Sequence, residues 1–319
     1  MNTFIAIDGG GTKTDAVLFS TAGQVLGRHI GPGCNPNDMG FEPALQALSE
    51  SVRALPIPSG AISGVFAGIS GAIAGDCRER FQQGLRLCLP GAQAVSVHGD
   101  IVPAITSGLI HKSGCLLICG TGCVAFARPI PGDNENLVRC GGWGHLLDKS
   151  GSGYDLGRDA LHAALCAYDG RSPAGAISEL VEQRLGRPVH QAVDQIYKNG
   201  KSFIASFAPV IFEAVRQGDL AALNILRENM AGLSNILNAA AAHIPGDGVC
   251  QTVLCGGVFK EFSLMEGLIR DNLSREHNFI LPKLPPVYGS AIQALGLAGI
   301  SPGEGFQQRF AESLSSLGT

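Results

Sequence analysis

The stretch that most constrains this chain runs from Ile5 to Thr14, where a short apolar segment ends in an aspartate, three glycines and Thr-Lys-Thr. Residues 15–20 (Asp-Ala-Val-Leu-Phe-Ser) read as a second strand, so the stretch predicts two strands joined by a glycine turn. Such turns leave backbone N–H groups free to form a concavity that suits phosphate. Asp8 at the strand end would serve Mg²⁺ beside that phosphate. We predict a nucleotide-phosphate hairpin, with an ordinary hairpin turn as the alternative.

Two better-known glycine loops do not fit the chain. A dinucleotide-binding loop needs Gly-x-Gly-x-x-Gly at the start of a helix, whereas β-forming residues follow Gly11. A P-loop ends in Gly-Lys-Ser or Gly-Lys-Thr, and only residues 200–202 have such a triplet. Gln195 stands where that motif needs its first glycine, and the residues before the triplet have a helical pattern. Neither loop is predicted.

The composition describes a globular protein with no nucleic-acid or membrane partner. At 319 residues the chain is long for one hydrophobic core, which favours two domains. Lys and Arg number 23 against 27 Asp and Glu, a net charge of −4, so there is no basic field for nucleic acid. The first four residues lack the features of a secretory signal, and no apolar stretch reaches membrane-spanning length. We expect a cytoplasmic protein.

The ten cysteines are scattered along the chain, and none forms a Cys-x-x-Cys pair. Several lie in apolar runs such as residues 115–119 (Cys-Leu-Leu-Ile-Cys). Buried cysteine packs as a small hydrophobic side chain, whereas structural zinc needs closely spaced ligand pairs. We therefore predict reduced core thiols rather than a metal site.

The first part of the chain alternates strands and helices after a β-meander. Turn-forming residues fill the loop 31–38, which follows the third strand. This alternation predicts an α/β sheet covered on both faces. The further strands are expected at 24–30, 61–69 and 94–97, and the helices at 42–55, 76–89 and 101–110.

The second part repeats the opening. Residues 115–119 form an apolar strand that ends in the turn Gly120-Thr121-Gly122, and a later strand ends in Gly256-Gly257. This repetition predicts a duplicated domain, residues 1–112 and 113–319, with glycine turns on a shared cleft and a last helix that can pack back on the first domain. Strands are expected at 123–128, 137–140 and 279–281, and helices at 154–168, 173–186, 190–198, 202–217, 219–243 and 289–298, with no prediction after Ser301.

Three glycine-marked strand ends occur in one order, at residues 8–12, 120–122 and 255–257. This ordered set resembles the two phosphate motifs and the adenosine motif of the actin-like ATPase and sugar-kinase superfamily. Residues 141–145 (Gly-Gly-Trp-Gly-His) narrow the similarity to the N-acetylglucosamine kinases, in the family that also includes benzoyl-CoA-reductase-type activator ATPases. The similarity covers residues 3–299. It implies duplicated ribonuclease-H-like α/β domains with a ligand cleft between them, in a homodimer.

The resemblance implies a role for each matching position. Asp8 would hold Mg²⁺ through water, and Asp100 matches the catalytic carboxylate, which also contacts the substrate. Lys13 either contacts phosphate or is simply a solvated lysine at the edge of a strand, and the sequence does not favour phosphate contact. The ATP-binding positions are Gly9, Gly10, Gly11, Thr12, Lys13, Gly120, Thr121, Gly122, Gly256 and Gly257. The other sugar-binding positions are Asn35, Gly142, Trp143, Gly144 and Asp148.

The implied reaction is ATP-dependent phosphorylation of the 6-hydroxyl of an amino sugar, N-acetylglucosamine in the first place and N-acetylmuramic acid or glucosamine as alternatives. Because a sugar hydroxyl is a poor nucleophile at neutral pH, a carboxylate must orient it and accept its proton. Asp100 follows the carboxyl end of a strand, where ligands bind in open α/β sheets. Taken alone, Asp100 would sooner be a helix N-cap, Trp143 a packing residue and Asn35 a turn residue.

Residues 147–152 (Leu-Asp-Lys-Ser-Gly-Ser) depart from the pattern Gly-Asp-Glu-Gly-Ser of the related kinases. Lys149 occupies the place of an aspartate that bonds a sugar hydroxyl. Either Asp148 reaches the sugar through a local backbone shift, or that contact is lost. As a hypothesis, Lys149 pairs with an anionic substituent such as the lactyl carboxylate of N-acetylmuramic acid.

Two other functions stay open. An activator ATPase would drive electron transfer from an iron–sulfur cluster, which needs cluster-ligating cysteines that the scattered thiols do not suggest. A sugar sensor without turnover is supported only by the change at residues 148–150.

Overall fold

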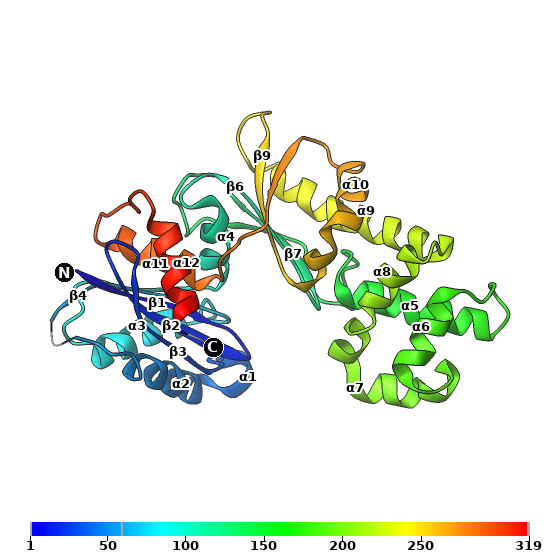
Figure 1. Cartoon of the computed structure of the whole chain (residues 1–319), viewed down its shortest axis with the longest axis horizontal. Coiled ribbons are helices and arrows are strands. Elements are labelled where there is room, and N and C mark those ends of the chain that lie inside the picture. The colour runs from blue at the N-terminus through cyan, green and yellow to red at the C-terminus, as the bar shows by residue number, and fades with distance from the viewer. Residues whose placement is uncertain (1, 59, 318–319) are drawn as a thin grey trace. The chain divides into compact units, whose positions relative to one another are not determined.

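A computed structural model of the chain describes residues 2–58 and 60–317 (Figure 1). The chain divides into two compact units, Met1–His111 with Pro282–Thr319, and Lys112–Leu281. The first segment of the first unit ends at His111, one residue before the end predicted for the first domain, residue 112. Residues 282–319 belong to the first unit. The predicted limits placed them in the second, although they allowed the last helix to pack back on the first domain, as α11 (Val287–Leu297) does.

The first unit contains one five-stranded sheet. Its strands are β1 (Thr3–Gly9), β2 (Lys13–Ser20), β3 (Val25–Pro32), β4 (Ile62–Ile69) and β5 (Val95–His98). The sheet order is β3-β2-β1-β4-β5, in which β1 to β3 form an antiparallel meander and β4 and β5 run parallel to β1. The apolar side chains of β1 are buried on both faces, as in a strand that helices cover from both sides.

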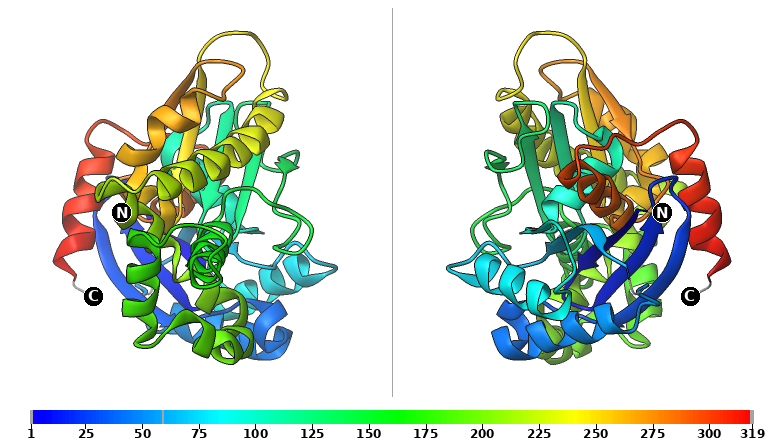
Figure 2. Two further views of the ribbon diagram at one scale, coloured as in Figure 1. Left: turned by 90° about the vertical axis from the view of Figure 1, so that its right-hand side faces the viewer. Right: turned by 90° about the vertical axis from the view of Figure 1, so that its left-hand side faces the viewer.

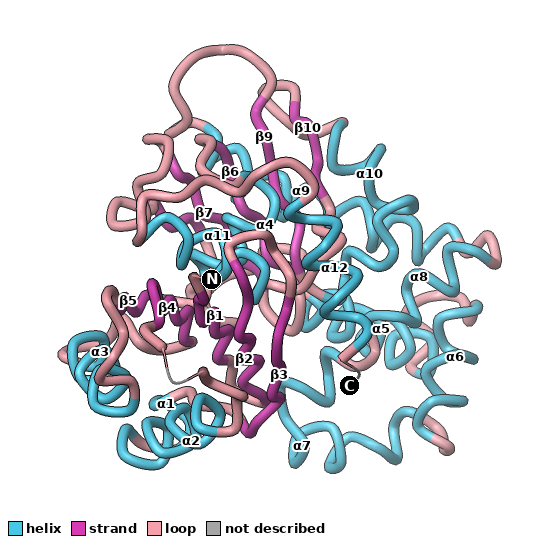
Figure 3. The backbone as a smooth tube through the Cα atoms, turned by 60° about the vertical axis from the view of Figure 1, so that its left-hand side comes forward, coloured by secondary structure: helices cyan, strands magenta, loops and turns pink. Residues whose placement is uncertain are grey.

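Helices cover both faces of this sheet (Figure 3). The helices α2 and α3 pack on one face, and α11 packs on β1 and β4 from the other, beside α4. The amphipathic patterns predicted α2 to α4 and α11 to within a few residues. The helices of the unit are α1 (Pro36–Met39), α2 (Phe41–Arg53), α3 (Cys77–Cys88), α4 (Ile101–Leu109), α11 (Val287–Leu297) and α12 (Phe306–Ser316).

An aromatic cluster holds the C-terminal helix α12 on the meander. The rings of Phe306 and Phe310 lie edge-on to that of Phe19, at centroid distances of 6.2 and 5.9 Å. Ser313 Oγ accepts a hydrogen bond of 2.9 Å from the backbone N–H of Val25. Figure 2 shows α12 beside the first strands in both views. Burial of these rings explains why the end of the chain joins the first unit.

The second unit repeats the topology of the first. Its strands are β6 (Gly114–Cys119), β7 (Cys123–Arg128), β8 (Val138–Cys140), β9 (Cys250–Cys255) and β10 (His277–Ile280). The sheet order is β10-β9-β6-β7-β8, with β6 to β8 antiparallel and β9 and β10 parallel to β6. Two sheets with the same sequence of hairpins and parallel strands confirm the predicted duplication.

A helical layer lies between β8 and β9 in the chain and packs on the second sheet. Its helices confirm the predicted run from residue 154 to residue 243. The gap predicted between the helices 190–198 and 202–217 matches an interruption of α7 at Gly200, which has φ +64°. The boundary between α7 and α8, at residues 206–207, was not predicted. No helix in the described ranges is long and apolar enough to cross a membrane. The helices between β8 and β9 are α5 (Gly153–Tyr168), α6 (Ala176–Leu185), η1 (Val189–Ala192), α7 (Val193–Ala205), α8 (Ala208–Arg216) and α9 (Leu220–Ala241), and η2 (Gly257–Glu261) and α10 (Phe262–Arg270) follow β9.

Candidate active site

In the first unit, three parallel strands bring polar side chains to one edge of the sheet. The strands β1, β4 and β5 are neighbours and point the same way. Asp8 lies near the end of β1, Ser70 directly follows β4, and Asp100 lies two residues beyond β5. The carboxyl edge of a parallel sheet is the usual place for a ligand in α/β folds.

The glycine turn after Asp8 offers free backbone donors at this edge. The N–H of Gly10 donates to the carbonyl of Lys13 (2.9 Å), and the carbonyl of Gly10 accepts from the N–H of Cys34 (3.0 Å). Within the described residues, the N–H groups of Gly11 and Thr12 have no acceptor, and both residues are exposed. Adjacent unpaired N–H groups are what a phosphate-binding turn provides. Lys13 is also exposed, at the start of β2.

The electrostatics of Asp8 fit a magnesium-binding role. Burial raises the pKa of Asp8 to about 7, repulsion from Asp100 and Asp15 adds to the rise, and Lys13 opposes it. A divalent cation would relieve this cost. No cluster of three or more His, Cys, Asp or Glu side chains that could hold a metal occurs in the described part of the chain. Mg²⁺ needs only one or two carboxylates, because it keeps waters and takes phosphate oxygens as further ligands.

Asp100 stands at the N-cap position of α4, yet its side chain makes no capping hydrogen bond to the helix. Burial raises the pKa of its carboxyl group, while hydrogen bonds from the Ser70 hydroxyl and from the backbone of Asp100 and Ile101 lower it in part. A buried carboxylate that makes no N-cap hydrogen bond and has a raised pKa can act as a general base. Ser70 was not predicted, although its place after an apolar strand pointed to this edge.

Asn35 combines a structural role with a place beside the glycine turn. Its Oδ1 accepts from the N–H of Asn37 (3.0 Å), which caps α1, and its Nδ2 donates to Asp38 Oδ2 (2.8 Å). A Cβ atom added to Gly11 would lie 2.9 Å from Asp38 Oδ2 and 3.9 Å from Asn35 Nδ2. Asn35 therefore does act as a turn residue, which was the alternative considered for it from the sequence. The exposed carboxylate of Asp38 is a site candidate that sequence reasoning missed.

In the second unit, the turn Gly120-Thr121-Gly122 joins β6 to β7. The N–H of Gly120 donates to the carbonyl of Gly122 (2.9 Å). The carbonyls of Gly120 and Thr121 accept from the N–H groups of Gly153 (2.8 Å) and Tyr154 (3.2 Å), at the start of α5. The first turn of α5 thus anchors the glycine turn and leaves Thr121 and Gly122 exposed.

The second glycine pair follows the neighbouring parallel strand β9. Gly256 has φ +109°, and a Cβ atom there would overlap the carbonyl oxygen of Cys119 at the end of β6. Only glycine allows the two strand ends to approach in this way. Gly257 has open space on the side where a Cβ would lie. The predicted phosphate turn and adenosine motif therefore lie on adjacent strand ends of one sheet.

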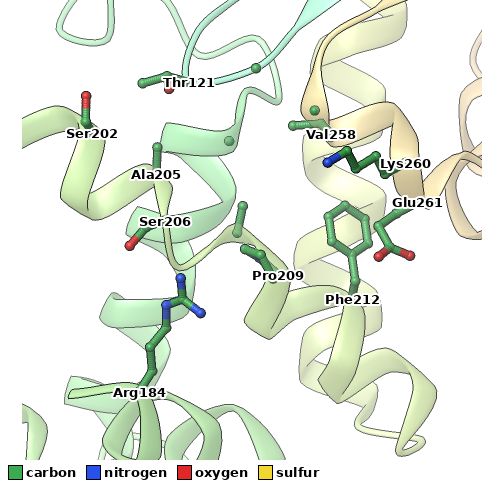
Figure 4. A pocket seen from close by; sticks show the side chains of 14 residues that line it. Thr121, Arg184, Ser202, Ala205, Ser206, Pro209, Phe212, Val258, Lys260 and Glu261 are labelled. Carbon is green, nitrogen blue, oxygen red and sulfur yellow. The ribbon is translucent and has the colours of Figure 1, made fainter. Parts of the chain in front are cut away.

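A cavity of about 530 Å³ opens beside these turns (Figure 4). This volume lies in the range of small-molecule pockets. Figure 4 shows Thr121 at one end and the guanidinium of Arg184 at the other, with Lys260 and Glu261 along the side. Sequence reasoning missed the helical residues of this wall, since their patterns are those of ordinary amphipathic helices. The lining residues are Gly120, Thr121, Gly153, Arg184, Ser202, Ala205, Ser206, Ala208, Pro209, Phe212, Gly257, Val258, Lys260 and Glu261.

The loop 141–148 is closed by Asp148. Its Oδ2 accepts from the N–H of Gly142 (2.7 Å) and, more weakly, from that of Trp143 (3.4 Å). The N–H of Asp148 donates to the carbonyl of Gly144 (2.9 Å). The indole of Trp143 is 63% exposed and lies under the guanidinium of Arg139 at 4.6 Å. The loop thus presents Trp143 outward, and the Asp148 carboxylate orders the backbone.

Lys149 already has an anionic partner in its own unit. Its Nζ lies 3.7 Å from Asp159 Oδ2, and Asp159 also accepts from Arg158 and Asn229. Lys149 thus has a carboxylate of its own unit as a neighbour, in addition to any that a substrate would bring. All ten cysteines are free thiols, and five of them are buried.

Comparison with known proteins places the chain among sugar kinases and ATPases. A profile of the BadF/BadG/BcrA/BcrD ATPase family matches residues 5–294. An N-acetyl-D-glucosamine kinase of Dictyostelium discoideum is 27% identical over 316 residues, which cover 92% of this chain and 97% of the relative. An N-acetylmuramic acid/N-acetylglucosamine kinase of Clostridium acetobutylicum is 29% identical over 235 residues, 72% of this chain and 76% of the relative.

The fold is shared with solved structures as well. The structure of a candidate N-acetylglucosamine kinase from Chromobacterium violaceum has a TM-score of 0.69 and 23% identity, and the match covers 92% of this chain and 99% of the other. At this identity the likeness shows the fold alone. It supports the duplicated α/β architecture predicted from the glycine-marked strand ends.

Proposed function

The chain belongs to the BadF/BadG/BcrA/BcrD ATPase family, and we propose that within it the protein is an ATP-dependent kinase that phosphorylates the 6-hydroxyl of an amino sugar. The observation that carries the proposal is the set of groups at the carboxyl edge of the first sheet. A carboxylate that makes no N-cap hydrogen bond, Asp100, lies near a second carboxylate, Asp8, and a turn with two unpaired N–H groups. These are the groups that phosphoryl transfer to an alcohol requires.

Each group has a task in this reaction. Asp100 accepts a hydrogen bond from the sugar hydroxyl and takes its proton as the hydroxyl attacks, and Ser70 keeps the carboxylate oriented. The N–H groups of Gly11 and Thr12 donate to phosphate oxygens, as does the turn around Thr121. Asp8 would hold Mg²⁺ through water. When bound, the ion offsets negative charge on the phosphates.

We propose that the cavity of the second unit takes the adenosine of ATP. Gly120, Thr121 and Gly257 line it, so the second phosphate turn and the adenosine motif open into one space. The loop with Gly142, Trp143 and Gly144 then belongs to the sugar side. We also propose that the protein is a homodimer in the cytoplasm and that its two domains bind the sugar and the nucleotide.

N-acetylglucosamine is the substrate that we favour. Two of the relatives are named for kinase activity on it. The ion pair with Asp159 gives Lys149 an anionic neighbour without the lactyl carboxylate of N-acetylmuramic acid. Asp148 would contact the sugar only through Oδ1, because its Oδ2 accepts a hydrogen bond from the backbone N–H of Gly142.

A coupled ADP-release assay tests the proposal with N-acetylglucosamine, N-acetylmuramic acid, glucosamine and glucose. We expect sugar-dependent ADP release, greatest with N-acetylglucosamine. Asp100→Asn should lower kcat by about 100- to 10,000-fold, the usual worth of a general base, with little change in the KM for ATP. Glu79→Gln, which alters an exposed carboxylate on α3, is the matched control. ADP release that no sugar stimulates, or an Asp100→Asn enzyme with full activity, would refute the assignment.

A further inference from the structure

Lys201 lies beside the glycine turn that joins β6 to β7. A Cβ atom added to Gly122 would lie 3.6 Å from Lys201 Nζ. Apart from the chain neighbours of Gly122, no other atom of the described residues comes within 4 Å of that position. The ammonium group is therefore the side-chain group nearest to the open face of this turn.

The backbone break in α7 precedes this lysine directly. Gly200 has φ +64° and ψ −152°, a conformation that other residues rarely adopt. After the break the chain turns back into a helix whose residues Ser202 and Ala205 line the same cavity as Gly120 and Thr121 (Figure 4). Ser202, the last residue of the triplet, thus lines the cavity, and Lys201 lies beside Gly122 at the turn next to it, although the triplet does not form a P-loop.

Lys201 has no counter-ion in the part of the chain that the structure describes. No carboxylate lies within 4.0 Å of its Nζ, and no acceptor is hydrogen-bonded to it, whereas Lys149 is paired with Asp159. The side chain of Lys201 is only half exposed. A partly desolvated ammonium without a partner gains from an anion nearby.

We infer that Lys201 is a phosphate-binding residue of the nucleotide site, which donates to the phosphate held by the turn Gly120-Thr121-Gly122. Charge-assisted hydrogen bonds measure about 2.8 Å, so donors that share one phosphate stand within about 6 Å of each other. The place of Lys201 Nζ beside Gly122 satisfies this requirement. The inference rests on the proposed function, because it needs an adenine nucleotide in the cavity.

The test measures displacement of a fluorescent ADP analogue by ADP and by adenosine, with three variants. Lys201→Met keeps the length of the side chain and removes its charge, and Lys201→Arg keeps the charge. Lys198→Met is the matched control, an exposed lysine on the same helix before the break. Thermal unfolding of each variant checks that it is folded.

We expect Lys201→Met to weaken ADP about 10- to 100-fold, the value of one charge-assisted hydrogen bond, and to leave adenosine unchanged. It should also flatten the salt dependence of ADP binding, while Lys201→Arg and Lys198→Met stay near wild type. Unchanged ADP affinity in a folded Lys201→Met protein overturns the inference and leaves the proposed function intact. Equal losses for ADP and adenosine overturn it too, since they indicate a damaged cavity. If the wild-type protein binds no ADP, the proposed function itself fails.

Discussion

Replacing Asp8 with asparagine should stabilise the metal-free protein at neutral pH. In the folded state the pKa of Asp8 is raised from 3.8 to about 7, with burial as the main cause and Asp100 as the next. Between these two pH values the folded protein holds a proton that the unfolded chain releases. The free energy of unfolding therefore falls as pH rises from about 4 to about 7, and this contribution is constant at higher pH.

The size of the effect follows from this difference. A difference of about 3 in pKa corresponds to about 4 kcal/mol above pH 7. Asparagine removes the charge but still buries an amide, which costs about 1 kcal/mol. We expect a net gain of about 2 to 3 kcal/mol for Asp8→Asn, or about 5 to 10 °C in the unfolding temperature of the first unit.

The assay is thermal or urea unfolding in a chelator at pH 5 and pH 8, for the wild type, Asp8→Asn and Glu79→Gln. The gain should be large at pH 8 and small at pH 5, and the exposed Glu79 should show neither. Saturating Mg²⁺ and ATP should stabilise the wild type more than the variant. If Asp8→Asn is no more stable than the wild type at pH 8, the carboxylate is not under electrostatic strain and this description of the site is wrong.

Two further predictions concern the second unit. Gly256→Ala should lower the free energy of urea unfolding by about 2 kcal/mol or more, because residue 256 has φ +109° and its Cβ atom would overlap the Cys119 carbonyl. Gly257→Ala, which has open space around it, should cost less than about 1 kcal/mol. Equal losses for the two variants would contradict the close approach of the strand ends. His277 is buried, with Nδ1 at 2.8 Å from Thr252 Oγ1, Nε2 unpaired and a pKa lowered to about 4, chiefly by burial. Because the unfolded chain takes up a proton first, the unit should lose up to about 3 kcal/mol between pH 6.5 and 4. His277→Gln should reduce this slope, and an unchanged slope would assign it to other groups.

The glycine turns could be predicted because the conformations they adopt leave a mark in the sequence. At Gly9, Gly11 and Gly256 an added Cβ atom would lie too close to a neighbouring atom, so the residue type reports the geometry. Asp8 and Asp100 could be singled out for a related reason, since each lies at the end of an apolar strand, and ligands of open α/β sheets usually bind at the carboxyl ends of the strands. The duplicated topology followed from the repeated order of strands and turns.

What could not be predicted depends on contacts between distant segments. The rings of Phe19 and Phe306 meet only in the folded unit, so nothing in the tail announced that α12 packs on the meander. Arg184 and Lys201 resemble ordinary charged residues on helix surfaces until the fold brings Arg184 to the cavity and Lys201 to the turn at Gly122. The hydrogen bonds of Asp148 to the backbone depend on how its loop closes, which residue order alone does not specify.

The most direct measurement identifies the product of the reaction. Purified protein is incubated with ATP, Mg²⁺ and N-acetylglucosamine, and phosphorus–proton correlation NMR and mass spectrometry follow the γ-phosphoryl group. The proposed function predicts one new phosphate ester, coupled to the protons at carbon 6 of the sugar, formed in equal amount to ADP. Transfer of the phosphoryl group to water alone, with the sugar recovered unchanged, would contradict it.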